Sequence, residues 1–319
     1  MGEFDLIERY FKRPAQRADV GIGDDCAVWT PRPGHQLAFS ADMLVEGRHF
    51  LTTVNPKFLG HKSLAVNLSD LAACGASPQA FLLSLSLPRA DEAWLSGFSE
   101  GLFQLSELHG CELIGGDTTQ GPLNIAITVM GDTPQGRSIL RSGARVGDDL
   151  YVSGHLGDAR LALEAFRGKV SLPQAVFDMA RRRMECPTPR VALGQALRGI
   201  ANAMADISDG LLGDLGHILK ASQVGAEIDT LAVTPLMQTG TLWSCPHDLA
   251  LTCVLSGGDD YELVFSASPL AAAQVQLAAQ STRTPVTRIG RVTDSQRLVL
   301  LGVEGLPITS SFESFDHFA

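Results

Sequence analysis

The 319-residue sequence contains no apolar run that approaches the roughly 20 residues needed to span a bilayer. Its first residues lack a basic segment and a cleavage-like site, so no signal peptide is expected, and Leu6 stands where a myristoylation motif requires Ser or Thr. The six cysteines form no C-x-x-C pair, which argues against a zinc knuckle or a disulfide framework. These absences predict a cytoplasmic protein without a membrane partner.

The common signatures of nucleotide-binding proteins are also missing. None of the five lysines follows a P-loop pattern, and the motifs of protein kinases are absent. Gly21 and Gly23 are not followed by the third glycine of a dinucleotide fingerprint. Any phosphoryl transfer would therefore rely on metal ions rather than on a P-loop lysine, since such transfer needs mostly positioning and charge neutralisation.

Acidic residues outnumber basic ones, 35 against 25, which gives a net charge of −10. A surface of that sign repels phosphodiester backbones, so general nucleic-acid binding is disfavoured. Carboxylates that hold divalent cations can nevertheless bind phosphate groups. Hydrophobic residues make up 45% and charged residues 19%, a globular balance, and the length suits two ordinary domains or one large one.

Periodicity and turn residues predict the elements of the first half. The clearest helix begins after Asn55, a plausible N-cap, with Pro56 in the first turn, and stops at Gly75. Further helices are expected at 3–12 and at 91–109, the latter ended by Gly110. Strands are expected at 27–29, 36–41, 80–87, 112–114 and 124–130.

The segment 131–136, Gly-Asp-Thr-Pro-Gln-Gly, is typical of a turn and suggests a domain boundary. Beyond it, strands are expected at 149–153, 203–206, 261–266 and 297–301, and helices at 157–167, 172–184, 189–198 and 208–222. Strands and helices mix in both halves without strict alternation. Two α+β domains, 1–135 and 136–319, are therefore predicted in preference to a doubly wound sheet.

Aspartates recur at predicted strand ends and loop mouths, often beside glycine. They fall within 23–25, 40–42, 69–70, 115–119, 206–210 and 257–262. Carboxylates gathered in this way repel one another unless cations lie between them, and Mg²⁺ is commonly held by one or two carboxylates together with phosphates. Each acid alone has an ordinary explanation, because aspartate is favoured in turns and at helix N-caps.

Asp70 resists that explanation, because it lies inside a helical pattern where aspartate is a poor choice. Ser63, Asn67 and Asp70 fall at i, i+4 and i+7 and form a polar stripe on an otherwise apolar helix. A helix that is polar on the side it should bury usually faces a site. The stripe therefore predicts a functional site against this helix.

Several motifs, in the same order along essentially the whole chain, resemble bacterial thiamine-monophosphate kinase. They are 20–27 (VGIGDDCA), 42–50 (DMLVEGRHF), 67–76 (NLSDLAACGA), 114–119 (IGGDTT), 208–211 (SDGL), 256–263 (SGGDDYEL) and the tail 315–318 (FDHF). Single pieces occur across the wider superfamily that includes aminoimidazole ribonucleotide synthetase and selenophosphate synthetase. The motif at 42–50 and the aromatic tail point to the thiamine enzyme.

This resemblance implies an aminoimidazole ribonucleotide synthetase-like fold. An N-terminal ATP- and metal-binding domain would contribute its mixed sheet to a barrel shared with a second subunit, and a C-terminal α/β domain would pack against it. The implied activity is direct transfer of phosphate from ATP to thiamine monophosphate, assisted by several Mg²⁺ ions in a homodimer. No catalytic general base is expected, because the attacking phosphate oxygen is already anionic.

Carried over position by position, the resemblance assigns three groups of residues. The implied metal ligands are Asp24, Ser40, Ala41 through its carbonyl, Asp42, Asp70, Asp117, Asp206 and Asp209. The implied ATP contacts are Gly116, Asp117, Arg141 and Ser208. The implied substrate contacts are His49, Glu262 and Phe315, with Phe318 as a rival for the aromatic role. An aromatic face with a carboxylate nearby suits a cationic ring, and an arginine fork suits phosphate oxygens.

Two alternatives remain open from the sequence. The first is another ATP-using member of the superfamily, although Cys26 lacks the neighbouring lysine expected of selenophosphate synthetase, and a hydrogenase-maturation relative would end in cysteine rather than Ala319. The second is a non-catalytic Mg-nucleotide sensor with the same fold. Such a sensor would be expected to have lost several of the acids, and this sequence has them all.

Overall fold

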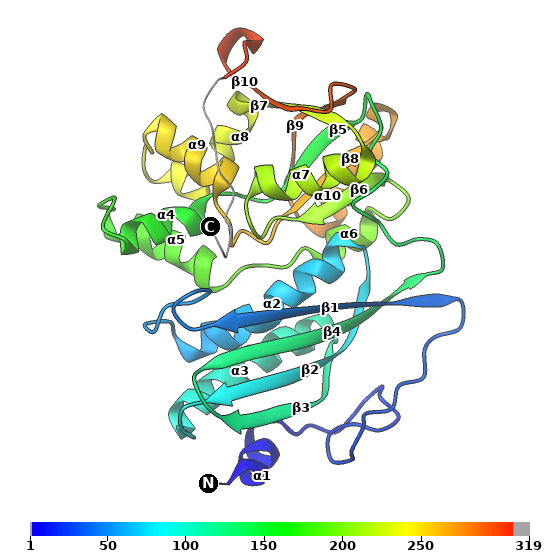
Figure 1. Ribbon diagram of the computed structural model, residues 1–319, viewed down its shortest axis with the longest axis vertical. Coiled ribbons are helices and arrows are strands. Elements are labelled where there is room, and N and C mark those ends of the chain that lie inside the picture. Colours follow the sequence, from blue (N-terminus) through cyan, green and yellow to red (C-terminus); the bar gives the residue numbers. More distant parts are fainter. Residues whose placement is uncertain (1, 309–319) are drawn as a thin grey trace. The chain divides into compact units, whose positions relative to one another are not determined.

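The computed structural model describes residues 2–308 (Figure 1). They belong to two compact units: one runs to Gly136 without residues 72–75, and the other comprises those four residues and the chain from Arg137 onward. The roles predicted for domains 1–135 and 136–319 stay predictions. Within residues 2–308, no helix combines the length and apolar character that a membrane crossing requires.

The first unit is built on a four-stranded mixed sheet with the order β1-β4-β2-β3. Strand β4 pairs antiparallel with β1 and β2, whereas β2 and β3 are parallel. Figure 1 shows the two long helices α2 and α3 together on one face of this sheet. The elements are α1 (Glu3–Leu6), a π-helical turn η1 (Ile7–Phe11), β1 (His35–Val45), α2 (Pro56–Ala73), β2 (Ser77–Leu87), α3 (Glu92–His109), β3 (Glu112–Gln120) and β4 (Asn124–Pro134).

Local capping chemistry sets the ends of α2 and α3, as the sequence predicts. The Asn55 side chain accepts a hydrogen bond from the Lys57 amide, and Asp91 accepts two from the first turn of α3. Gly75 and Gly110 follow the helices with φ angles of 69° and 56°, which glycine adopts without strain. These short-range interactions are why both helices could be predicted accurately.

Glycines let α2 and α3 approach each other closely. A Cβ atom on Gly101 would lie 1.8 Å from the Lys57 carbonyl oxygen, and one on Gly60 would lie 2.0 Å from that of Phe98. Leu64, Leu95 and Leu102, all fully buried, belong to the apolar layer that these helices form against the sheet. This contact fixes the spacing of the two helices that cover the sheet.

Two predictions for the first unit are wrong. The segment 131–136 is not simply a turn, because β4 continues to Pro134 in register with β1. Gly131 allows close approach to the Ser77 carbonyl, and Asp132 forms an ion pair with Arg32. The strand predicted at 27–29 is reduced to a single bridge between Val20 and Val28.

The face of the sheet opposite α2 and α3 carries exposed apolar side chains. Phe39 and Met43 on β1 are 64% and 55% exposed, and Leu82 on β2 is 39% exposed. Within the described chain the sheet is open, with β1 and β3 as its edges. A barrel of the predicted kind would therefore require a second subunit.

The second unit contains a six-stranded sheet with the order β10-β7-β9-β5-β8-β6, in which only β10 and β7 pair in parallel. Its strands are β5 (Asp149–Ser153), β6 (Ala201–Asp206), β7 (Gly225–Asp229), β8 (Leu263–Ala267), β9 (Val286–Thr293) and β10 (Leu298–Leu301). Its α-helices are α4 (Asp158–Phe166), α5 (Gln174–Glu185), α6 (Val191–Ala196), α7 (Leu211–Ser222), α8 (Thr230–Val233), α9 (His247–Ser256) and α10 (Ala272–Thr282). Short 3₁₀ turns are η2 (Thr234–Leu236), η3 (Gln238–Thr241), η4 (Pro269–Ala271) and η5 (Val303–Gly305).

Together the two units confirm the expected two-domain fold, in which mixed sheets combine with helices. Strand β8 begins later than predicted, because Asp259 and Tyr261 have φ angles of 66° and 50°, which a strand does not allow. Helix α7 begins at Leu211 rather than at 208, because residues 207–210 form a separate turn.

Candidate functional site

The polar stripe of α2 lies against β1, the strand that carries three of the predicted metal ligands, Ser40, Ala41 and Asp42. The Ser40 hydroxyl donates to the Asp70 carboxylate, at 2.5 Å between the oxygens. The Asn67 side-chain oxygen accepts from the Asp42 amide at 3.1 Å, and its nitrogen donates to the Ser63 carbonyl at 3.0 Å. The structure therefore brings Ser40, Asp42 and Asp70 together between the strand and the helix.

Asp24 and Asp117 lie elsewhere in the first unit. Asp24 is in an exposed loop, where its carboxylate accepts from the Asp25 amide. Asp117 is exposed on β3, next to Gly116, whose φ of 143° and contact with the Leu83 carbonyl allow no side chain. Within residues 2–308, no group of three or more Asp, Glu, His or Cys side chains is arranged to hold a metal ion.

The sheet order separates Asp42 from the motif that contains Asp117. The strand register aligns Asp42 with Ile127, Ile127 with Leu83, and Leu83 with Gly116. This row crosses the whole sheet, so Asp42 and Gly116 are three strand spacings apart, about 14 Å. Asp117 follows Gly116 directly, so one chain alone does not bring Asp42 and Asp117 to the same cation.

His49 lies in a tight turn after β1, where hydrogen bonds hold both its ring and its carbonyl oxygen. Its Nδ1 accepts from the Val45 amide at 3.0 Å, which places the ring proton on Nε2. The buried Lys62 of α2 donates to the His49 carbonyl oxygen at 3.1 Å. The turn therefore fixes the ring in the tautomer whose donor nitrogen is Nε2.

In the second unit, the turn 206–210 carries Asp206, Ser208 and Asp209 at the end of β6. The neighbouring loop 257–261 holds it from one side, through bonds from the Asp259 amide to Ser208 O and from the Tyr261 amide to Ile207 O. On the other side, one carboxylate oxygen of Asp214 accepts from the amides of Ser208 and Asp209, at 3.0 and 3.1 Å. Asp214 is not among the site residues predicted from the sequence.

Arg141 lies in a segment that is attached to the other end of α7. The Ser222 hydroxyl donates to the Arg141 carbonyl at 3.3 Å and accepts from the amides of Gly143 and Ala144 at 3.1 Å each. Burial raises the pKa of Asp214 to about 6, and the Asp209 charge adds to this rise, whereas the Arg141 charge opposes it. The positive charge of Arg141 therefore acts on the carboxylate that holds this turn.

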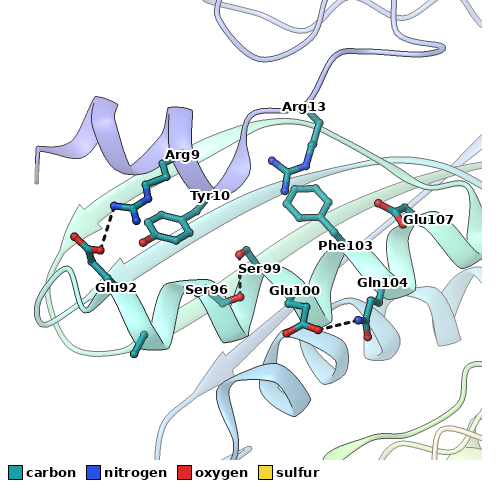
Figure 2. A pocket seen from close by; sticks show the side chains of 11 residues that line it. Arg9, Tyr10, Arg13, Glu92, Ser96, Ser99, Glu100, Phe103, Gln104 and Glu107 are labelled. Atoms are coloured by element: carbon teal, nitrogen blue, oxygen red, sulfur yellow. Dashed lines mark hydrogen bonds and ion pairs between the residues drawn. The ribbon is translucent and has the colours of Figure 1, made fainter.

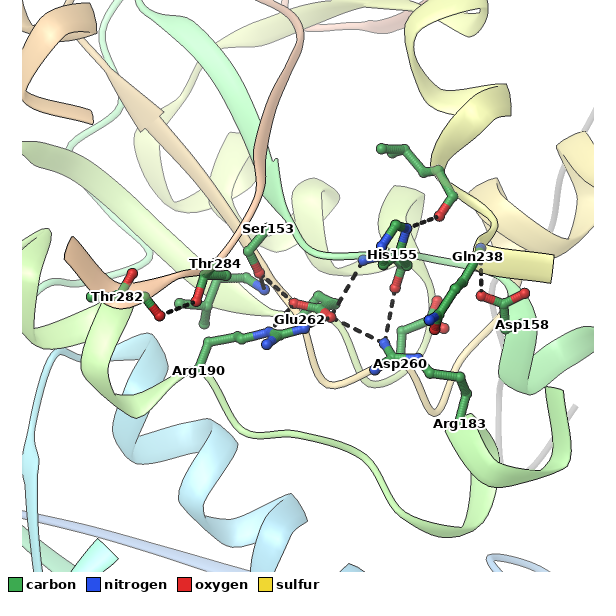
Figure 3. Close-up of polar contacts among 12 residues, drawn as sticks. Ser153, His155, Asp158, Arg183, Arg190, Gln238, Asp260, Glu262, Thr282 and Thr284 are labelled. Atoms are coloured by element: carbon green, nitrogen blue, oxygen red, sulfur yellow. Dashed lines mark hydrogen bonds and ion pairs between the residues drawn. The ribbon is translucent and has the colours of Figure 1, made fainter. Parts of the chain in front are cut away.

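Glu262 is completely buried and surrounded by donors (Figure 3). Arg190 binds both carboxylate oxygens, and Arg183 donates to one of them at 3.0 Å. Ser153 donates to the other at 2.6 Å. Burial would raise the pKa of Glu262, but the hydrogen bond and charge of Arg190, with the charge of Arg183, outweigh it and lower that pKa. The predicted substrate contact of Glu262 stays a prediction, and Phe315 and Phe318 lie outside the described residues.

Asp260, two residues before Glu262, is also buried, and its protonation in the folded protein can be tested. Both of its carboxylate oxygens lie 3.0 Å from the Gly157 amide, and burial raises its pKa well above the ordinary value, against the effects of that amide and of Arg183. Above the unfolded-state pKa of about 3.9, the folded protein therefore keeps a proton that the unfolded chain has lost, so rising pH destabilises the fold. We expect Asp260→Asn to raise the melting temperature relative to the wild type by an amount that grows from pH 5 to pH 8. Melting curves at several pH values, with a difference that stays constant, would contradict the assignment.

The first unit also contains a cavity that is separate from its predicted site residues (Figure 2). It measures about 660 Å³ and is bordered by the N-terminal turn and α3, with Arg13 stacked on Phe103 at 4.3 Å. None of the predicted ligands lines it. We therefore do not assign the candidate site to this cavity.

Both domains of this fold match a known class of proteins. Residues 23–133 match the AIR synthase related protein, N-terminal domain, and residues 145–302 match the corresponding C-terminal domain. The Escherichia coli (strain K12) thiamine-monophosphate kinase is 45% identical over 100% of this chain and 98% of its own length. The chain therefore belongs to the thiamine-monophosphate kinase family.

Solved structures of the same family agree with this assignment. The thiamine-monophosphate kinase from Stenotrophomonas maltophilia K279a is 41% identical, covers 96% of each chain and has a TM-score of 0.85. A structure described as AaThiL complexed with AMPPCP and TMP is 29% identical, with a TM-score of 0.76 over 91% of this chain and 89% of that one.

Proposed function

We propose that this enzyme transfers the terminal phosphate of ATP directly to thiamine monophosphate, giving thiamine diphosphate. The observation that carries the proposal is the set of oxygen donors, Ser40, Asp42 and Asp70, gathered between β1 and the polar stripe of α2. Support comes from the full-length similarity to thiamine-monophosphate kinases and from the AaThiL complex with AMPPCP, an analogue of ATP, and TMP.

The donor chemistry fits Mg²⁺. Carboxylates, a hydroxyl and a carbonyl are hard oxygen ligands, which Mg²⁺ prefers, and the proposed set contains no thiol or imidazole. We assign Asp24, Ser40, Ala41, Asp42, Asp70, Asp117, Asp206 and Asp209 to metal binding. Bound Mg²⁺ would offset the charge of the phosphate groups.

The remaining assignments concern orientation rather than proton transfer. Gly116, Asp117, Arg141 and Ser208 are proposed to contact ATP, and His49, Glu262 and an aromatic such as Phe315 are proposed to contact the thiamine phosphate. In the tautomer that the Val45 amide selects, Nε2 is the donor nitrogen of the His49 ring. A phosphate acceptor attacks as an anion, so no side chain has to remove a proton from it.

A homodimer explains two features of the first unit. The exposed apolar face around Phe39 and Met43 would be covered by the same face of a second copy, as in an isologous contact. The separation of Asp42 from Gly116 and Asp117 would be overcome if edge β1 of one copy met edge β3 of the other. We propose a cytoplasmic dimer with no nucleic-acid or membrane partner.

³¹P NMR of the purified protein with ATP, Mg²⁺ and thiamine monophosphate tests the reaction. New resonances of thiamine diphosphate, with one ADP formed for each, are the expected result. ADP and free phosphate without thiamine diphosphate would indicate another substrate within the superfamily. No reaction at all would favour a nucleotide sensor and would contradict the proposed activity.

A further inference from the structure

Asp214 is the fourth residue of α7 and is 3% exposed. Its Oδ2 atom accepts two backbone hydrogen bonds, from Ser208 at 3.0 Å and from Asp209 at 3.1 Å. Its own amide donates to Gly210 O, so the side chain folds back over the turn that precedes its helix. A single buried oxygen therefore fixes two consecutive peptide groups between β6 and α7.

These two peptide groups belong to residues whose side chains the proposed function uses. Hydrogen bonds to an ionised acceptor are stronger than neutral ones, and a water-excluded site increases their strength further. The loop 257–261 binds the carbonyl side of the same turn, through Ile207 O and Ser208 O. With both its amides and its carbonyls held, the turn has little freedom to reorient the Ser208 hydroxyl or the Asp209 carboxylate.

The two hydrogen bonds to Asp214 also determine which groups of the turn can contact a ligand. Backbone amides next to a helix N-terminus are ordinary donors to phosphate, but here an internal carboxylate already occupies both of them. A phosphate at this turn can therefore be contacted by the Ser208 hydroxyl or through a cation on Asp209, and not by these two amides.

We propose that Asp214 is a positioning residue for phosphoryl transfer, which orients Ser208 and Asp209 toward the metal-bound nucleotide without contacting it. The proposal rests on the proposed function, since it takes the roles of Ser208 and Asp209 from there. Asp214 would thus serve the site through its backbone rather than by touching a ligand. The same hydrogen bonds explain why the amides of Ser208 and Asp209 do not bind phosphate.

The test compares Asp214→Leu with Asp214→Asn. Leucine leaves both amides without an acceptor, and we expect kcat/KM for ATP to fall roughly 100-fold, the effect of displacing a site group by about 1 Å. The Mg²⁺ concentration for half-maximal rate should rise along with it. Asparagine keeps a carbonyl acceptor and should restore kcat/KM to within about tenfold of the wild type.

Asp158 provides the matched control. It is fully buried at the start of α4 and likewise accepts two backbone amides, from Gln238 and Thr239, but it holds a different turn. Asp158→Asn should lower the melting temperature while leaving the Mg²⁺ dependence unchanged. If Asp214→Leu did the same, the residue would have a structural role alone and the proposal would be overturned.

The variants Ser208→Ala and Asp209→Asn test whether the turn serves the reaction at all, independently of the role proposed for Asp214. If both variants retain wild-type kinetics, the turn does not serve the reaction and the assignment of its residues is wrong. If both lose activity while folded Asp214→Leu keeps the wild-type kcat/KM and Mg²⁺ dependence, the function stands and the positioning role is refuted.

Discussion

Asp42→Asn and Asp117→Asn are each expected to abolish turnover while the protein stays folded, yet a heterodimer of the two inactive chains should recover about half of the wild-type rate. The reason is the strand order, which places these residues at opposite edges of one sheet. If each site combines Asp42 of one copy with Asp117 of the other, the heterodimer has one intact site and one doubly altered site.

Chains with two different affinity tags allow such a heterodimer to be purified and assayed directly. The matched control pairs Asp42→Asn with a chain that carries both substitutions, because neither of its sites would be intact and it should stay inactive. An inactive Asp42→Asn/Asp117→Asn heterodimer would show that both residues act within one chain. Near-wild-type rates in either single variant would contradict the metal-binding assignment itself.

Gly101→Ala is expected to destabilise the protein by about 3 kcal/mol, because overpacking forces backbone to move. The new methyl group would lie 1.8 Å from the Lys57 carbonyl oxygen and 3.1 Å from the His61 amide nitrogen, both in the backbone of α2. No flexible side chain can move aside, so α2 and α3 must separate. Thermal melting of the variant should show a clearly lower midpoint.

Two helical glycines serve as controls for the intrinsic effect of alanine. Gly97 is on the same helix, but a Cβ there would meet the Pro56 side chain at 3.2 Å, a contact that small shifts can relieve. Gly216 on α7 has no atom within 4 Å of such a Cβ, so Gly216→Ala should stabilise by about 0.5–1 kcal/mol through helix propensity. Equal effects at Gly101 and Gly97 would show that close packing is not the cause.

The parts of the fold that follow from local chemistry were predictable. Helices α2 and α3 have caps and stop residues within one turn of their ends, and β5 coincides with its predicted range. Strands β7 and β9 were missed because they are held by pairing with each other rather than by a strong pattern of their own. The turn predicted at 131–136 failed because the residue types of a turn are used there for packing and for an ion pair across the sheet.

In the candidate site, too, the features set by local sequence spacing were predictable and those set by long-range contacts were not. The polar stripe on α2 was visible because its spacing is helical, and its contacts with Ser40 and Asp42 confirm that it faces β1. Arg183 and Arg190 gave no signal, because their partner Glu262 is 79 and 72 residues away in the sequence. Asp214 went unnoticed for a different reason: an aspartate in the first turn of a helix is common, and only its acceptor geometry distinguishes it.

The buried Lys62 has a consequence for chemical labelling. Acylating reagents attack amines that solvent can reach, and Lys62 is only 2% exposed, whereas the other four lysines lie at or near the surface. Its ammonium group donates to the His49 carbonyl oxygen, so opening of the turn that carries His49 would break this contact. Acylation of this one lysine, read by mass spectrometry, therefore reports how often the structure around this contact opens, and protection by a substrate phosphate would show that the bound phosphate reduces that opening.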